Sequence, residues 1–172
     1  MKAQDVMSVR VHTVRPEDPV SKAVALICRH RISGVPVVDK GGDLVGVISE
    51  RDVLQAMYPD KPALKARRRV SRSKGRLREF ERLRAADIMV RDVITALPEA
   101  DLLLLASLMA TRKIRRIPIV KGRQLVGIVS QGDVYRGLFQ GGRRQPQEGH
   151  SRRPPAQPVA TGAPPLERQE RG

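Results

Sequence analysis

The sequence is poor in aromatic residues, in cysteine and in long apolar stretches. It has two Phe, two Tyr and no Trp in 172 residues, so its core must be aliphatic. Too few rings are present to favour recognition of single-stranded nucleic acid by base stacking. The one cysteine, Cys28, has no intramolecular disulfide partner. No apolar run approaches the ~20 residues of a membrane span, and no secretory signal follows Lys2. We expect a cytoplasmic protein without a membrane segment.

Residue types used in catalysis and metal binding occur, but not in the spacings that such sites need. His12, His30 and His150 stand apart in the sequence, and no HExxH, CxxC or GxxxxGK[ST] pattern is present. We therefore expect no catalytic site and no resident cofactor or metal. His30 lies between two arginines and is expected on the surface, whereas Cys28 is expected in the core.

The net charge of +15 is unevenly distributed. Residues 58–84 hold 11 basic and 3 acidic residues, which is more than half of the net charge. Such a segment suits a solvated connection between folded parts. It also suits an arm that neutralises nucleic-acid phosphates, although zinc ligands and a helix-turn-helix pattern are absent. Within it, residues 77–83 are expected to form a short helix, because Phe80 and Leu83 are spaced i, i+3.

An internal repeat is the strongest feature of the sequence. Asp5 recurs as Asp87, a shift of 82 residues, and later motifs recur with a shift of 81. The repeated motifs are Asp5-Val6-Met7 and Asp87-Ile88-Met89, Pro16-Glu17 and Pro98-Glu99, Val35-Pro36-Val37-Val38 and Ile117-Pro118-Ile119-Val120, and Leu44-Val45-Gly46-Val47-Ile48-Ser49 and Leu125-Val126-Gly127-Ile128-Val129-Ser130. The lost residue falls in a turn, where deletions cost least. We interpret the chain as a tandem duplication.

Each copy predicts the order strand, helix, strand, turn, strand, helix. The first strand is expected at residues 11–14 and again at 93–96. The helix that follows in the first copy has an apolar face, formed by Val20, Val24, Ile27 and Cys28. Two apolar runs around a glycine-rich turn, residues 35–38 and 44–48, predict a β-hairpin. One copy buries little surface, so we expect both copies to pack on a shared core.

These motifs resemble a cystathionine β-synthase (CBS) repeat in both copies. The likeness rests on an Asp-hydrophobic-Met opening, a Thr-x-x-Pro turn, a hydrophobic-Pro strand and a Gly-x-x-Ser-x-x-Asp ending, over roughly 110 residues. It implies an α/β (α+β) fold similar to a Bateman module, with two repeats related by a pseudo-twofold axis and a three-stranded sheet in each. We assign residues 1–57 and 85–140 to the repeats, 58–84 to a basic linker, and 141–172 to a disordered tail.

Ser49 and Asp52 form the first candidate site, and Ser130 and Asp133 form its counterpart. A Ser that ends a strand and caps a helix brings together a hydroxyl, helix N–H groups and the carboxylate three residues later. Taken alone, Ser-x-x-Asp is better explained as a capping box that serves only the helix end. The resemblance favours ligand binding, because these positions contact phosphate and ribose in ligand-binding CBS repeats.

Arg115 and Arg116 form the second candidate site, at the position where repeat one has Ser33 and Gly34. A guanidinium matches a phosphate with two parallel hydrogen bonds, and two solvated arginines are the plain alternative. The resemblance implies that these positions face the cleft between the repeats. We expect a ligand phosphate to bind nearer to repeat two, because Ser33 and Gly34 in repeat one are small and uncharged.

The resemblance also implies a place for the adenine. Four residues are expected to border it: Thr13, Val14, Thr95 and Ala96. Ordinary strand positions are the alternative. Together these implications describe a regulatory module that binds AMP, ADP, ATP or S-adenosylmethionine and signals to an unknown effector protein.

The helix expected around residues 102–109 is apolar on most of its surface. It holds Leu102, Leu103, Leu104, Leu105, Leu108 and Met109. One face suffices to cover a sheet, so the surplus predicts a homodimer interface, with deep burial inside one chain as the alternative. Two other functions remain open. One is a nucleic-acid-binding protein that grips through residues 58–84, and the other is a purely structural dimerisation module.

Overall fold

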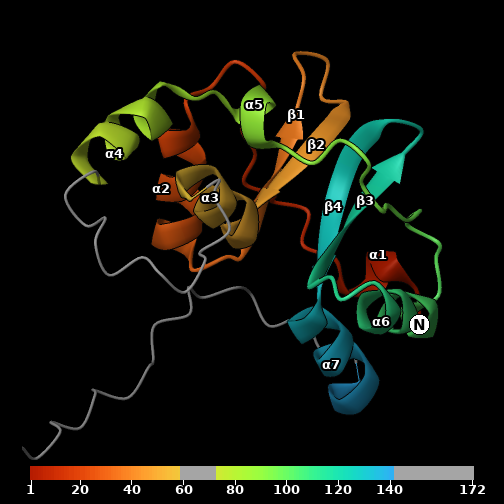
Figure 1. Cartoon of the computed structure of the whole chain (residues 1–172). Coiled ribbons are helices and arrows are strands. Elements are labelled where there is room, and N and C mark those ends of the chain that lie inside the picture. Colours follow the sequence, from red (N-terminus) through yellow and green to blue (C-terminus); the bar gives the residue numbers. More distant parts are fainter. Residues whose placement is uncertain (59–72, 142–172) are drawn as a thin grey trace, which may run out of the picture.

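The structure is a computed structural model that describes residues 1–58 and 73–141. The predicted tail and most of the basic linker, residues 142–172 and 59–72, lie outside the described residues. In chain order the elements are α1 (Ala3–Val6), α2 (Val20–His30), β1 (Gly34–Val38), β2 (Leu44–Ser49), α3 (Glu50–Met57), α4 (Ser73–Arg82), α5 (Ala85–Ile88), α6 (Leu102–Thr111), β3 (Arg116–Lys121), β4 (Gln124–Ser130) and α7 (Gln131–Gln140). Figure 1 shows two lobes, one around β1 and β2 and the other around β3 and β4.

Each lobe is built on the predicted hairpin. β1 pairs with β2 and β3 pairs with β4, both antiparallel. The apolar runs of these strands supply the centre of each core, and their fully buried side chains are Val35, Pro36, Val37, Ile48, Ile117, Pro118, Ile119 and Val129. Helices then cover the hairpins, so the fold is the mixed helix-and-strand class that the sequence predicts.

The third strand predicted for each sheet is reduced to one residue. Val14 forms a single parallel bridge with Val37, and Ala96 forms the equivalent bridge with Ile119. The sheets therefore have two strands each. In the first lobe the N–H of Arg15 donates to the Asp18 carboxylate at 2.7 Å, and this turn carries the chain away from β1 before a ladder can form.

Helix α2 shows which face of the predicted helix is buried. Val20, Ala23 and Ile27 point into the core, and the helix ends where Arg31 adopts a left-handed conformation with φ of 50°. Cys28 is exposed, so its prediction as a core residue was wrong. The buried stripe runs through Ala23, which places Cys28 on the rim of the helix. His30 is exposed, as predicted.

The two lobes exchange their opening segments. α1 precedes the first hairpin in sequence but lies in the second lobe beside α6, where Ala3 is fully buried with Leu102 and Leu105. α5 precedes the second hairpin, yet Ala85 and Met89 belong to the core of the first lobe. Each core is therefore completed by a segment from the other repeat.

The methionine of each opening motif lies against a glycine of the opposite hairpin. A Cβ atom on Gly46 would lie 2.7 Å from the sulfur of Met89, and one on Gly127 would lie 2.6 Å from the sulfur of Met7. Backbone hydrogen bonds of 2.9–3.0 Å hold the same contacts on each side, between Val47 and Val90 and between Ser8 and Ile128. The repeated Met and the repeated Gly thus form one contact, made twice.

The contacts between the lobes have the same symmetry as the internal repeat. The Ser8–Ile128 bridge becomes the Val90–Val47 bridge when each residue is replaced by its equivalent in the other copy. Asp43 and Gln124 are equivalent to one another and are also paired with one another. A residue that pairs with its own counterpart lies on a twofold axis, so the predicted pseudo-twofold relation is present.

Helix α4 covers one end of this symmetric body. It packs on α2 and α3 (Figure 1), and its Phe80 is buried, so the predicted short helix near residues 77–83 exists. At the other end, Leu103 and Leu104 of α6 and Phe139 of α7 are exposed, with 65%, 55% and 81% of their surface accessible. No helix in the described part of the chain is long and apolar enough to cross a lipid bilayer.

The Met–Gly contact predicts a coupled pair of substitutions. Met89→Ala should lower the free energy of unfolding by about 2 kcal/mol or more by leaving a cavity. Gly46→Ala should lower it by about 1–3 kcal/mol through overpacking. The double variant should lose at least about 0.5 kcal/mol less than the sum, because each change relieves the other.

Urea unfolding followed by circular dichroism measures this coupling. Gly41→Ala in the turn serves as the control, and its effect should simply add to that of Met89→Ala. Strict additivity for Gly46→Ala would show that the methionine and the glycine do not compete for the same space.

Candidate functional site

The N-terminal turns of α3 and α7 hold the first candidate residues. In α3 the Asp52 Oδ2 atom accepts hydrogen bonds from the Ser49 N–H at 2.8 Å and from its hydroxyl at 2.5 Å. In α7 the Asp133 Oδ2 atom accepts the same two bonds from Ser130, at 2.7 and 2.6 Å. The capping box is therefore formed in both repeats. The capping box uses the Oδ2 atom of each aspartate. The two repeats differ in the surroundings of the other oxygen, Oδ1.

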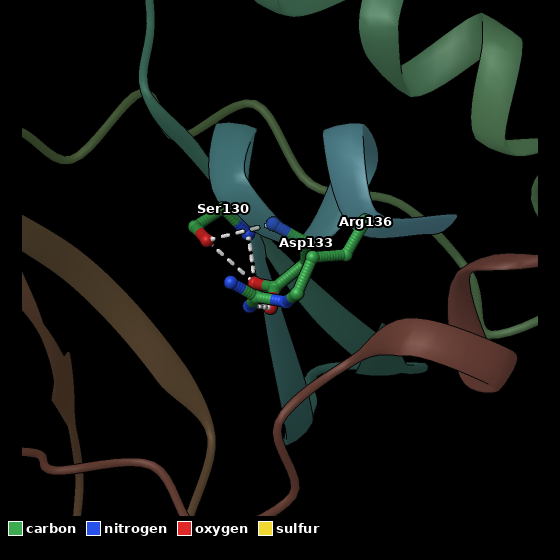
Figure 2. Close-up of polar contacts among 3 residues, drawn as sticks. All are labelled: Ser130, Asp133 and Arg136. Carbon is green, nitrogen blue, oxygen red and sulfur yellow. Dashed lines mark hydrogen bonds and ion pairs between the residues drawn. The ribbon is translucent and has the colours of Figure 1, made fainter. Parts of the chain in front are cut away.

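In repeat two the second oxygen is already paired. Arg136, one turn further along α7, donates through Nη2 to Asp133 Oδ1 (Figure 2). The Asp133 side chain is only 7% exposed, whereas that of Arg136 is 44% exposed. A ligand hydroxyl that reached this carboxylate would have to displace a cation from a buried anion.

In repeat one the aspartate borders open space. Asp52 is half-buried and lines a pocket of about 470 Å3. The other lining residues are Gln55 and Ala56 of α3, Asp87 and Ile88 of α5, and Leu83 and Val90, which flank α5. The pocket thus combines an apolar wall with two carboxylates and an amide, a composition common in small-molecule sites.

Most of these lining residues were missed by reasoning from the sequence. Asp87 was noted only as part of the repeated opening motif, and Leu83 only as part of a short helix. They reach Asp52 because α5 is exchanged into the first lobe, and no local pattern near Asp52 shows this. The recurrence of Asp-hydrophobic-Met was the one signal that could have directed attention to them.

Arg116 joins the two halves of the second candidate site. Its guanidinium crosses from the start of β3 to repeat one, where Nη2 donates to the Ser33 hydroxyl at 2.5 Å and Nη1 donates to the Gly34 carbonyl. The room expected at Ser33 and Gly34 is therefore filled by this side chain. Arg115 beside it is exposed.

The groups around Arg116 shift its pKa in opposite directions. Burial lowers the pKa of the guanidinium, the Glu50 carboxylate raises it, Arg115 lowers it and Asp133 raises it. The side chain remains a cation, as guanidinium groups do in proteins. Its Nε atom is buried and has no hydrogen-bond partner among the described residues. The Arg116 guanidinium is thus held at the seam, by which we mean the boundary between the two repeats, and its Nε–H group is left without an acceptor.

The four residues expected at the adenine have different surroundings. Val14 is buried in the first core, and its backbone bonds Pro36 and Val38 of β1 at 3.1 and 2.9 Å. Ala96 takes the equivalent place beside β3, Thr13 is half-buried and Thr95 is exposed. None of the four lines the pocket at Asp52, so their role at the adenine remains a prediction.

Two histidines that are distant in sequence meet in the structure. The rings of His12 and His30 stack with centroids 3.7 Å apart and planes 17° from parallel. Burial, the neighbouring His30 and Arg29 lower the pKa of His12. Parallel stacked rings do not direct their nitrogens to a common point. Within residues 1–58 and 73–141, no group of three or more His, Cys, Asp or Glu side chains is arranged to hold a metal ion.

Known proteins resemble this chain over most of its length. A family model described as a CBS domain matches residues 3–72 and 85–139. Uncharacterized protein MJ1426 of Methanocaldococcus jannaschii is 30% identical over 159 residues, which cover 81% of this chain and 92% of the relative.

Two solved structures have a similar fold. The crystal structure of CBSX2 in complex with AMP has a TM-score of 0.66 and 26% identity, and covers 83% of this chain and 98% of its own. The CBS domain pair of protein MJ0100, in complex with 5'-methylthioadenosine and S-adenosyl-L-methionine, has a TM-score of 0.63 and 26% identity with the same coverage.

The unequal surroundings of the two aspartates predict unequal effects on stability. Asp52→Ala should lower the free energy of unfolding by about 1 kcal/mol, because it removes the carboxylate that accepts from the Ser49 N–H in the capping box. Asp133→Ala should cost more, because it also empties a buried position and leaves Arg136 without its anion. Urea unfolding compares the two variants. Equal losses would contradict a structural role for the Asp133–Arg136 pair.

Proposed function

The chain belongs to the CBS-domain family, and from this premise we propose that it is a regulatory module that binds an adenine nucleotide at the seam between its two repeats. The match to the CBS family model over both repeats supports the premise. The crystal structures of similar fold support the ligand class, since AMP, 5'-methylthioadenosine and S-adenosyl-L-methionine all contain adenosine.

The pocket at Asp52 is the observation that carries the proposal. It is a surface pocket, open to solvent, with a volume of about 470 Å3. Asp52 is half-buried at its edge, and its Oδ2 atom is already oriented by Ser49. A carboxylate fixed in this way is preorganised to accept hydrogen bonds from the two ribose hydroxyls, as acidic residues do in dinucleotide sites.

The seam also offers groups for a phosphate. Ser49 ends β2 at the first turn of α3, and Arg116 reaches Ser33 and Gly34, the residues that open β1. Arg116 presents a half-buried cation there, and Arg115 is its exposed neighbour. Phosphate–guanidinium bonds are charge-assisted and stronger than bonds to a neutral hydroxyl, so a phosphate can compete with Ser33 for Arg116.

Regulation would follow from the position of this site between two repeats. The repeats are joined by the exchanged segments, by the Arg116 bonds and by the ion pair of Arg123 with Asp43 at 3.4 Å. A ligand that contacts both sides favours one relative arrangement of the repeats to the extent that it binds that arrangement better. An effector protein that distinguishes the arrangements then receives the signal.

A panel of adenine ligands tests the proposal. AMP, ADP, ATP and S-adenosylmethionine are added separately, and at least one should raise the thermal unfolding midpoint, with about 2.7 kcal/mol of stabilisation at 100 times its dissociation constant. Asp52→Ala should abolish the shift. Asp101→Ala is the matched control, because Asp101 also caps a helix through its carboxylate but does not line the pocket.

The panel has clear unfavourable outcomes. The absence of a shift with all four ligands would reject the sensor function and favour the structural module. A shift that Asp52→Ala leaves intact would place the ligand elsewhere. Arg116→Met should weaken AMP more than adenosine, because the variant removes the cation but keeps the length of the side chain.

We further propose that two chains associate through the apolar surface of α6. Leu103 and Leu104 are exposed there, in agreement with the surplus of leucine in this helix. Size-exclusion chromatography with light scattering should find a dimer for the native chain and a monomer for Leu103→Glu/Leu104→Glu. Val9→Glu, at an exposed apolar residue of another segment, should remain dimeric. A monomeric native chain would contradict the proposal.

The remaining expectations stay predictions. They are a cytoplasmic location, the absence of an enzymatic activity and the identity of the effector. Nucleic-acid binding through residues 58–84 also remains open, and most of that segment lies outside the described residues. Such binding should collapse between low and moderate salt concentration, which separates it from binding of a nucleotide in a pocket.

A further inference from the structure

The two capping boxes are followed by different residues at one equivalent position. Gln55 in α3 corresponds to Arg136 in α7 by the shift of 81 residues that relates these helices. Both residues lie three positions after the capping aspartate, which is one helical turn. They are therefore placed to meet the second oxygen of Asp52 and of Asp133, respectively.

Arg136 uses that placement to neutralise Asp133. Its Nη2 atom pairs with Oδ1, while Ser130 occupies Oδ2 (Figure 2). All the bonds that the structure gives this carboxylate come from its own helix and cap. Because the Asp133 side chain is 7% exposed, water and ligands have little access to it.

Gln55 does not neutralise Asp52. It is uncharged, and together with Asp52 it lines the pocket of about 470 Å3. Among the described residues, no cation forms an ion pair with Asp52. The same fold thus presents an accessible carboxylate in one repeat and a neutralised, buried carboxylate in the other.

We propose that Arg136 is a built-in counter-ion that keeps Asp133 from binding a ligand, so that each chain binds one adenine nucleotide, at Asp52. This inference rests on the proposed function and adds its stoichiometry and the residue that sets it. A ribose hydroxyl is a neutral donor, so it cannot replace the positive charge of Arg136, and taking the partner away from a buried ion leaves an uncompensated buried charge. The ribose therefore does not displace Arg136 from Asp133.

Exchanging the two residues tests the proposal. Isothermal titration with AMP, and in parallel with S-adenosylmethionine, should give one site per native chain. Arg136→Gln should give two sites, because the variant removes the cation that pairs with Asp133 Oδ1. Gln55→Arg should give none. The double exchange Gln55→Arg/Arg136→Gln should restore one site.

Two controls keep the result interpretable. Arg136→Lys retains the positive charge beside Asp133 and should keep one site per chain. Circular dichroism and thermal unfolding of each variant establish that it is folded before its sites are counted. If Arg136→Gln fails to fold, Gln55→Arg still tests the proposal, because the substitution adds a charge at a residue that lines the pocket.

The possible outcomes separate this inference from the proposed function. Two sites in the native chain, or one site in both the native chain and a folded Arg136→Gln variant, would overturn the role of Arg136 and leave the sensor intact. Full AMP or S-adenosylmethionine binding by Gln55→Arg would also overturn it. No binding of AMP, ADP, ATP or S-adenosylmethionine to the native chain or to Arg136→Gln would reject the proposed function itself.

Discussion

The exchange of the opening segments is the constraint on which the rest of the structure depends. Ala85 and Met89 complete the core of the first lobe, and Ala3 completes that of the second. Neither repeat encloses its core with its own residues. The chain is therefore one cooperative body with two cores, and a change in one opening segment acts on the opposite hairpin.

The candidate site is a product of the same constraint. Asp52 stands on α3 of repeat one, whereas Asp87 and Val90 arrive with the exchanged segment. A pocket built from both repeats responds to their relative position more directly than a pocket within either repeat. This is the physical reason that a ligand at the seam suits regulation.

The sequence supports prediction of the elements better than prediction of their contacts. The repeat predicted both hairpins and the helices that Ser49 and Ser130 cap, because these follow from local pattern and from duplication. The pseudo-twofold relation was implied by the resemblance to CBS repeats. The repeat did not predict that the opening segments are exchanged. Its pattern is the same whether an opening segment packs on its own copy or on the other one. The exposure of Cys28 was also missed. Its helix has two adjacent apolar stripes, and the buried one contains Ala23 rather than Cys28.

Helix α4 makes an otherwise symmetric body different at its two ends. α4 packs on α2 and α3 at one end (Figure 1), while Leu103 and Leu104 of α6 are exposed at the other. A body with an adhesive surface at both ends can add further copies without limit and grow into a filament. With α4 covering one end, the association through the leucines that we propose would use the same patch on both molecules and would stop at two chains.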